Sequence, residues 1–195
     1  RTGAHALRNS LFAILENRKD EISPRMNDLI VGLNADWQAL DERIEDITGE
    51  IEMISKGEEN CKRLMSVPGI GPIISTAVVA AIGTGDAFGR GRDFGAWLGL
   101  VPRQYSTGGK TVLGRISKRG SKYLRTLFIQ AAHVILMRPN NWQKFSFGPW
   151  LTEASTRLHR NKLATALANK LARIAWSVLA SQKAFDANRK EVTAI

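Results

Sequence analysis

A heptad repeat runs from Met26 to Ile54, and it constrains the fold of this chain more than any other feature of the sequence. Apolar residues alternate there in steps of four and three, which is the spacing of a long helix with one apolar seam. Pro24 favours the start of such a helix, and Gly57 favours its end. The helix either packs on its own domain or forms a coiled-coil arm that dimerises or docks a partner helix, and we favour the coiled coil. The seam consists of Met26, Ile30, Leu33, Trp37, Leu40, Ile44, Ile47, Ile51 and Ile54.

The remaining periodicity is mainly helical, so the sequence predicts a mostly α fold. Residues 1–59 are expected to form a helical, coiled-coil linker and dimerisation arm, with self-association through residues 24–57. Residues 60–195 are expected to form a compact helical domain that contains a helix-hairpin-helix and a loop or short β-hairpin. The chain opens with Arg1 inside a helix-like pattern, which indicates a fragment of a longer protein.

Positive charge is concentrated in the second half of the chain. Residues 1–93 carry 15 acidic and 11 basic residues, whereas residues 94–195 carry 3 acidic and 17 basic residues. An asymmetry of this size favours a polyanionic partner, and nucleic acid is the expected one. The single cysteine, Cys61, excludes an internal disulfide, and the three scattered histidines indicate no metal site. No apolar run is long enough to span a membrane, and there is no secretory signal.

Residues 62–83 predict two helices joined by a Pro-Gly-Ile-Gly-Pro turn. This pattern resembles the helix-hairpin-helix motif of DNA-binding proteins. In that motif the glycines, here Gly69 and Gly71, let backbone N–H groups approach a phosphate. The alternative is an ordinary helical hairpin that binds no ligand.

A Ser-Thr-Gly-Gly turn lies in residues 101–115, which predict a loop or a short β-hairpin. A hydroxyl at a glycine turn and close to many cations suits chemistry on a phosphodiester. Attack by Ser106 on phosphorus would give a phosphoserine ester and release a strand end. The segment lacks a general base, which either Asp86, Asp93 or absent chain would have to supply. The alternative for Ser106 is a turn serine with no covalent role.

A basic helix is predicted from residue 117 to residue 137. Lys118, Arg119, Lys122 and Arg125 are spaced to share one exposed face of it. Like charges so close together repel one another, so the cluster favours a phosphate partner. Together with the serine loop, the cations expected to bind or neutralise phosphates are Arg103, Lys110, Arg115, Lys118, Arg119, Lys122 and Arg125.

Two stretches resemble a known family. They read RLMSVPGIGPIISTAVVAAIG and DFGAWLGLVPRQYSTGGKTVLGRISKRGSKYLRTLFIQAA, and with them the resemblance covers about residues 60–137. The chain is similar to the C-terminal transposase domain of the bridge-RNA-guided serine recombinases of bacterial insertion sequences. In that family a serine in the glycine-adjacent block joins DNA. The matching position here is Ser106, with Thr107 as the alternate.

The resemblance also implies what lies outside this chain. The family has an N-terminal acidic, RNase-H-like domain that binds a divalent metal, here expected to be Mg²⁺, and its sequence context is absent. The 195 residues are therefore expected to hold no metal or cofactor and to be inactive alone. DNA is the implied partner, a guide RNA is a further one, and the implied location is the bacterial cytoplasm, at the nucleoid.

A rival interpretation is that the chain binds nucleic acid but carries out no chemistry on it. The helix-hairpin-helix and the basic helix could make a non-catalytic DNA- or RNA-binding and oligomerisation module. Replacing Ser106 with alanine separates the two interpretations, because only the transposase loses strand joining.

Overall fold

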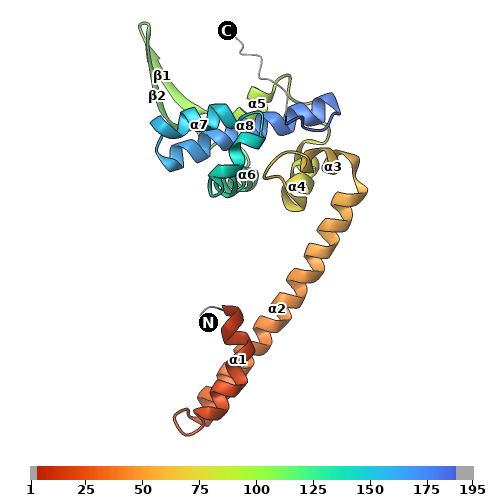
Figure 1. The fold of residues 1–195 in the computed structure, drawn as a ribbon, viewed down its shortest axis with the longest axis vertical. Helices are drawn as coiled ribbons and strands as arrows, with labels where there is room; N and C mark the ends of the chain where they lie inside the picture. Colours follow the sequence, from red (N-terminus) through yellow and green to blue (C-terminus); the bar gives the residue numbers. More distant parts are fainter. Residues whose placement is uncertain (1–3, 188–195) are drawn as a thin grey trace. The chain divides into compact units, whose positions relative to one another are not determined.

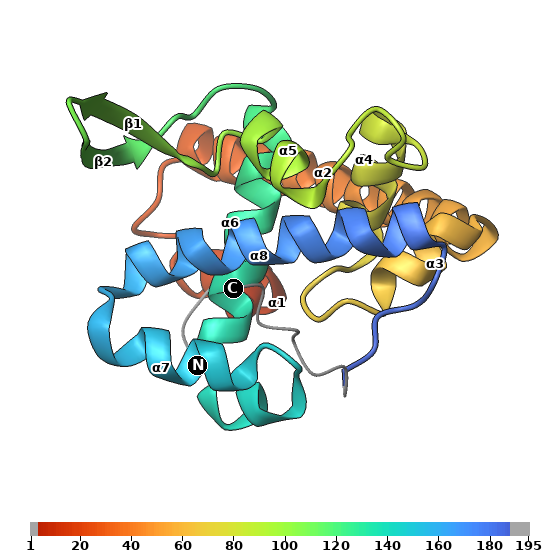
Figure 2. The ribbon, with the colours of Figure 1, turned by 90° about the horizontal axis from the view of Figure 1, so that it is seen from above.

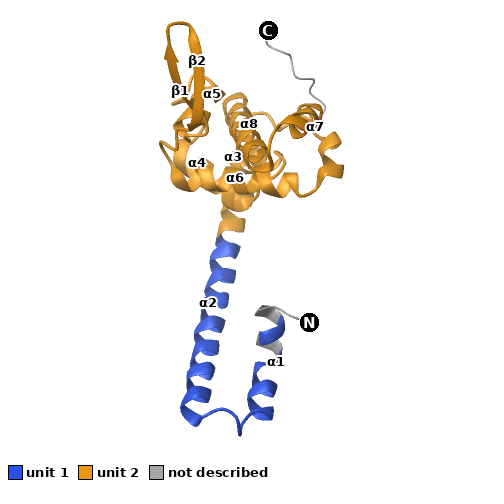
Figure 3. Ribbon diagram, turned by 90° about the vertical axis from the view of Figure 1, so that its left-hand side faces the viewer, with its two compact units in different colours: residues 1–50 blue, residues 51–195 orange. Residues whose placement is uncertain are grey.

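The computed structural model describes residues 4–187, and the expected mostly α fold is confirmed (Figure 1). The chain divides into two compact units, residues 1–50 and residues 51–195, and the division falls inside helix α2 (Figure 3). None of the described helices is long and apolar enough to cross a membrane. The elements are α1 (Ala4–Asn17), α2 (Pro24–Gly57), α3 (Glu59–Met65), α4 (Pro72–Ile82), α5 (Gly91–Trp97), β1 (Pro102–Thr107), β2 (Lys110–Ile116), α6 (Lys122–Leu136), the 3₁₀ helix η1 (Pro139–Lys144), α7 (Gly148–Arg157) and α8 (Arg160–Ser181).

The first unit is a helical hairpin made of α1 and the first part of α2. The heptad stretch forms one continuous helix of 34 residues, as its spacing predicts. The Ser23 hydroxyl accepts a hydrogen bond from the Met26 N–H, and Pro24 fills the first helical position, where a missing N–H costs nothing. The apolar seam is open: Leu40 is 60 % exposed and Ile44 is 61 % exposed. A stripe of this kind normally lies against another helix.

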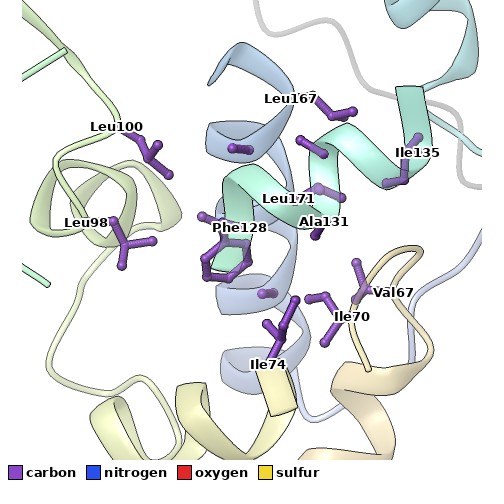
Figure 4. Packing of buried hydrophobic residues seen from close by; sticks show 14 of the residues in the cluster. Val67, Ile70, Ile74, Leu98, Leu100, Phe128, Ala131, Ile135, Leu167 and Leu171 are labelled. Carbon is purple, nitrogen blue, oxygen red and sulfur yellow. The ribbon is translucent and has the colours of Figure 1, made fainter. Parts of the chain in front are cut away.

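The second unit is built on α8, which packs against α3, α5, α6 and α7 (Figure 2). Leucine and alanine recur along its buried face, so neighbouring helices can approach its backbone closely. Phe128, Ala131 and Ile135 of α6 face this helix and also the turn between α3 and α4 (Figure 4). The buried face of α8 contains Leu163, Ala164, Leu167, Ala168, Leu171, Ala172, Ala175, Val178 and Leu179.

The turn between α3 and α4 is packed onto α6. Gly69 has a φ of +81°, which favours glycine, and a Cβ there would lie 3.1 Å from the Ile135 side chain and 3.4 Å from the Ala131 Cβ. The Cys61 thiol of α3 is buried, and this burial raises its pKa, while a hydrogen bond with Ser75 acts in the opposite direction. The hairpin of helices is therefore a fixed part of the core.

Two backbone segments lie in direct contact at the base of the β-hairpin. The Ser117 N–H donates to the Val101 carbonyl at 2.8 Å, and the Lys118 N–H donates to the Gly99 carbonyl at 3.1 Å. Gly99 (φ +71°) faces the backbone of Arg119, and a Cβ on it would overlap that backbone. We call this contact between residues 97–101 and residues 117–120 the glycine clasp.

The clasp corrects the predicted start of the basic helix. Residues 117–121 are not helical, and α6 begins at Lys122 after Ser121, whose hydroxyl accepts the Leu124 N–H. Lys118 (φ +56°) and Gly120 (φ +75°) both adopt left-handed backbone conformations, which end any helical path. The backbone groups of this segment bond to residues 99 and 101 instead of continuing a helix.

The clasp yields a prediction about stability. In Gly120→Ala the new Cβ would overlap the Trp97 carbonyl, so the two segments must separate. We expect the free energy of unfolding to fall by about 3 kcal/mol, measured by urea denaturation. Gly71→Ala is the matched control, because its φ is −108° and its Cβ would meet open space. Equal stability of the two variants would contradict the close backbone contact.

Candidate nucleic-acid interface

The serine segment forms a two-stranded antiparallel hairpin that extends from the helices of its unit (Figure 1). Thr107 pairs with Lys110, so Gly108 and Gly109 alone make the turn. Both have positive φ, +53° and +82°, as a type I′ turn requires. Every residue of β1 is exposed, and β2 is exposed up to Arg115. Of the two alternatives left open by the sequence, loop or hairpin, the structure has the hairpin.

Ser106 lies on one face of this hairpin, and its hydroxyl oxygen has a defined partner. The Gln104 side-chain amide donates to Ser106 Oγ at 2.7 Å. Pairing places Thr111 and Leu113 on the same face. Because side chains alternate along a strand, Thr107 points to the opposite face. Ser106 and its predicted alternate, Thr107, therefore point to different faces of the hairpin.

The opposite face carries an aromatic side chain over a glycine. Tyr105 pairs with Val112, and a Cβ on Gly114 would lie 2.9 Å from the Tyr105 ring. The register shifts between Pro102 and Gln104, where β2 has one residue more than β1. Such a bulge increases strand twist and re-aims the side chains beside it. Tyr105 is 59 % exposed, so this face is open to a partner as well.

Six of the seven predicted phosphate-binding cations are exposed around the hairpin and its base. Lys110 adjoins the turn, and Arg103 reaches back to donate to the Ser117 carbonyl at 3.4 Å. The hydrogen bond to Ser106 comes from an amide and not from one of these cations. These exposed cations are Arg103, Lys110, Arg115, Lys118, Arg119 and Lys122.

Arg125, the seventh, is not on the exposed face that the helical spacing predicted. It is only 9 % exposed, and its Nη1 donates to the Leu98 carbonyl at 2.9 Å and to the Arg119 carbonyl at 3.1 Å. The guanidinium therefore joins the two halves of the glycine clasp. A guanidinium has several N–H donors in one plane, so Arg125 can donate to two backbone carbonyls at once.

The predicted partners of the serine chemistry lie elsewhere. Asp86 accepts a hydrogen bond from Thr84, and Asp93 lies in the first turn of α5, so neither contact involves the hairpin. Within residues 4–187, no group of three or more His, Cys, Asp or Glu side chains could hold a metal ion. Among the described residues, the side-chain partner of the Ser106 hydroxyl is the Gln104 amide and not a carboxylate or an imidazole.

The two turn glycines differ in what surrounds them. Gly71 precedes α4, and a Cβ there would meet nothing within 4 Å, so a ligand can approach the start of this helix. Gly69 faces α6 instead. Pro72 fills the first position of α4 and offers no N–H. Phosphate binding at this turn remains a prediction.

Sequence reasoning missed a pocket at the root of the hairpin. It has a volume of about 460 Å³ and lies where α5, α8 and the start of β1 meet. Its polar lining is Arg92, Asn169 and Arg173. These residues are up to 81 positions apart in the sequence, so only folding brings them together. The one signal in the sequence is the spacing of Asn169 and Arg173, which puts both on one face of a helix.

Comparison with known proteins identifies the class of this domain. Residues 61–146, which contain the hairpin and the clasp, match the family described as "Transposase IS116/IS110/IS902 family". The compact helical unit is thus a transposase-family domain. This chain belongs to the IS116/IS110/IS902 family of transposases of bacterial insertion sequences.

Three relatives show how much of the chain is shared. The transposase for insertion sequence element IS1328 of Yersinia enterocolitica is 44 % identical over 158 residues, 81 % of this chain and 47 % of the relative. A probable family 20 transposase of Pseudomonas aeruginosa is 39 % identical over 95 % of this chain and 54 % of its own length. The transposase for insertion sequence element IS1111A of Coxiella burnetii is 38 % identical over 94 % and 50 %. The chain spans about half the length of these curated relatives.

The position of Arg125 gives a prediction that separates stability from binding. Arg125→Met leaves two carbonyls of the clasp without their donor, so the free energy of unfolding should fall by about 2–4 kcal/mol in urea denaturation. Lys122→Gln removes an exposed cation and should change stability by less than about 0.5 kcal/mol while weakening binding to a short DNA duplex. An Arg125→Met variant as stable as the parent would show that Arg125 does not hold the glycine clasp together.

Proposed function

We propose that this chain is part of a DNA transposase in which Ser106 cleaves and rejoins strands through a phosphoserine intermediate. One observation carries the proposal: the serine hydroxyl stands on the open face of a hairpin, and a DNA strand can reach it without any movement of the core. The family shown by the comparisons, whose relatives are named transposases of insertion sequences, supports DNA as the substrate.

The chemistry exchanges one ester for another. Ser106 Oγ forms a bond to phosphorus as the bond from phosphorus to one bridging strand oxygen breaks. The hydroxyl proton passes to a base, and the leaving oxygen takes up a proton and becomes a strand hydroxyl. In the reverse step a strand hydroxyl attacks phosphorus, and Oγ leaves with a proton. Ester energy is conserved, so the rejoining step needs no ATP.

The exposed cations supply electrostatic stabilisation. The transition state gathers negative charge on the phosphoryl oxygens, and guanidinium and ammonium groups oppose that charge. Lys110 is beside the turn, and Arg103 and Arg115 flank the bulge. Lys118, Arg119 and Lys122 extend the basic surface from the clasp. In this proposal Arg125 acts through its carbonyl contacts and positions the clasp.

The base is assigned to a part of the protein outside this chain. The family resemblance implies an acidic domain with a divalent metal, Mg²⁺, and a guide RNA that directs the strand choice. It follows that these residues alone bind nucleic acid without joining it, and that the whole protein works in the bacterial cytoplasm on nucleoid DNA. The helical turn at Gly69 and Gly71 would add a contact to backbone phosphate.

The exposed seam of α2 supports a self-associating arm. From Ile30 on, the first apolar position of the heptads is isoleucine except at Trp37, and the second is leucine or isoleucine, which is a pattern of coiled coils. No helix of the described first unit covers Leu40 or Ile44. Recombination joins several strand ends, so two or more copies of the serine must meet. We propose that residues 24–57 bring them together.

One observation favours a second candidate function. The hydrogen bond to Ser106 comes from a neutral amide, as it would in a turn serine with no covalent role. The rival function is a non-catalytic DNA- or RNA-binding and oligomerisation module. In this function the same cations bind nucleic acid, and no phosphoserine ester forms.

The serine is tested in the full-length protein. Ser106→Ala should abolish strand joining and the covalent protein–DNA adduct, while DNA affinity stays within about twofold, because only the nucleophile is lost. Thr107→Ala tests the alternate, and Thr111→Ala is the matched control on the same face. Adduct formation by Ser106→Ala, mapped by peptide sequencing, would move the nucleophile to Thr107 or another residue, whereas a parent protein that forms no adduct would favour the rival module.

The seam is tested by charge. Ile44→Lys with Ile47→Lys places two cations on the exposed apolar stripe, so sedimentation should show the dimer converted to monomer. Glu42→Lys with Glu45→Lys is the control, because these exposed positions lie off the seam. A parent protein that is monomeric at every concentration would contradict self-association through residues 24–57.

A further inference from the structure

We propose that the pocket at the root of the hairpin is a binding site for the backbone of the DNA strand that reaches Ser106. The proposal rests on the proposed function and gives the strand a fixed second point of attachment. The pocket belongs wholly to the second unit and is lined by Arg92, Leu100, Val101, Pro102, Ala166, Asn169 and Arg173.

Small residues on α5 create the pocket by letting α5 and α8 approach. A Cβ on Gly91 would lie 3.0 Å from the Arg173 carbonyl, and a Cβ on Gly95 would lie 3.2 Å from the Asn169 amide nitrogen. The two glycines are four residues apart, so they share one face of α5. Arg92 follows Gly91 on α5 and lines the pocket together with Arg173 of α8.

The lining matches the chemistry of a nucleotide strand. Two guanidinium groups on exposed residues can hold a phosphate with paired N–H donors. The Asn169 amide offers both a donor and an acceptor, and Leu100 and Pro102 provide an apolar floor for a sugar. The nearby carboxylate, that of Asp93, lies toward Gly89. Because the pocket is basic and apolar together, it suits a polyanion with a carbon framework.

The position of the pocket connects it to the serine. Pro102 lines the pocket and also begins β1, and Ser106 follows four residues later on the same strand. An extended strand of that length covers about 13 Å. This distance corresponds to a few nucleotides of one DNA strand. Arg103 lies between these two points in the chain, and its guanidinium, which donates to the Ser117 carbonyl, adds positive charge at the base of the hairpin.

Helix α8 extends the same path in the other direction. Lys162, Ala166, Asn169 and Arg173 are spaced by four, three and four residues, so they lie on one stripe of the helix. Lys162 is exposed and outside the pocket lining. The stripe therefore offers a further cation to the strand beyond the pocket.

The test measures binding of a short mixed-sequence DNA duplex to the full-length protein by fluorescence anisotropy over a range of salt concentrations. Arg92→Gln with Arg173→Gln should weaken binding about tenfold or more and reduce the log–log salt slope by about 0.9 for each phosphate released. Arg157→Gln is the matched control, because Arg157 is an exposed helical arginine that pairs with Glu153 outside the pocket. It should leave the slope unchanged.

A second measurement locates the contact. Duplexes that carry a single neutral methylphosphonate are scanned position by position, and the parent should lose affinity most at one phosphate a few nucleotides from the adduct. The double variant should no longer distinguish that position. If the double variant binds and scans like the parent, the pocket assignment is wrong.

These outcomes are distinguishable from failure of the serine proposal. If Ser106→Ala still forms the adduct while Arg92→Gln with Arg173→Gln weakens binding, the pocket stands and the nucleophile is misassigned. If the adduct depends on Ser106 while the double variant keeps the parent's affinity and salt slope, the strand takes another route and the pocket proposal falls.

Discussion

The backbone of residues 97–101 lies on the backbone of residues 117–120, with no side chain between them at Gly99 and Gly120. Both ends of the β-hairpin leave from this contact, so its geometry sets where the hairpin starts and how it is oriented on its unit. Arg125 completes the arrangement by donating to a carbonyl on each side. A buried arginine is costly without partners, and here two carbonyl acceptors offset that cost. A hairpin that is itself exposed thereby gains a rigid base.

The rigid base matters because an isolated two-stranded hairpin is marginally stable in water. Ser106 is held by Gln104 and by strand pairing, but the register of those strands depends on the clasp below them. The same clasp orients Leu100, Val101 and Pro102, which line the pocket beside α8. One structural device thus places a hydroxyl, a set of cations and a pocket in a fixed relation, which the proposed strand-transfer site would require.

The sequence was sufficient where a local pattern decides the structure. The heptad spacing gave the helix of α2, and the glycine pair gave the turn of the hairpin, because both depend on residues close in the chain. Arg125 was misjudged because its spacing fits either an exposed or a buried face, and its acceptor on Leu98 lies 27 positions away. The helix starts later than predicted because Ser117 and Lys118 donate to Val101 and Gly99, a tertiary contact that local propensity does not contain. The pocket could not be predicted from the sequence because it forms only where α5 and α8 meet in the fold.

In the described part of the chain, β1 and β2 form a sheet of only two strands, so each has one edge without a neighbouring strand. Unpaired edges invite pairing with other extended chains, and natural proteins oppose this with charge and with bulges. Here the edges are protected by the charges of Lys110 and Arg103 and by the bulge beside Arg103. A polyanion that neutralises these cations would lift the repulsion between two such ribbons. Contact between the ribbons of two copies of this chain would then be favoured with a polyanion bound and suppressed without one.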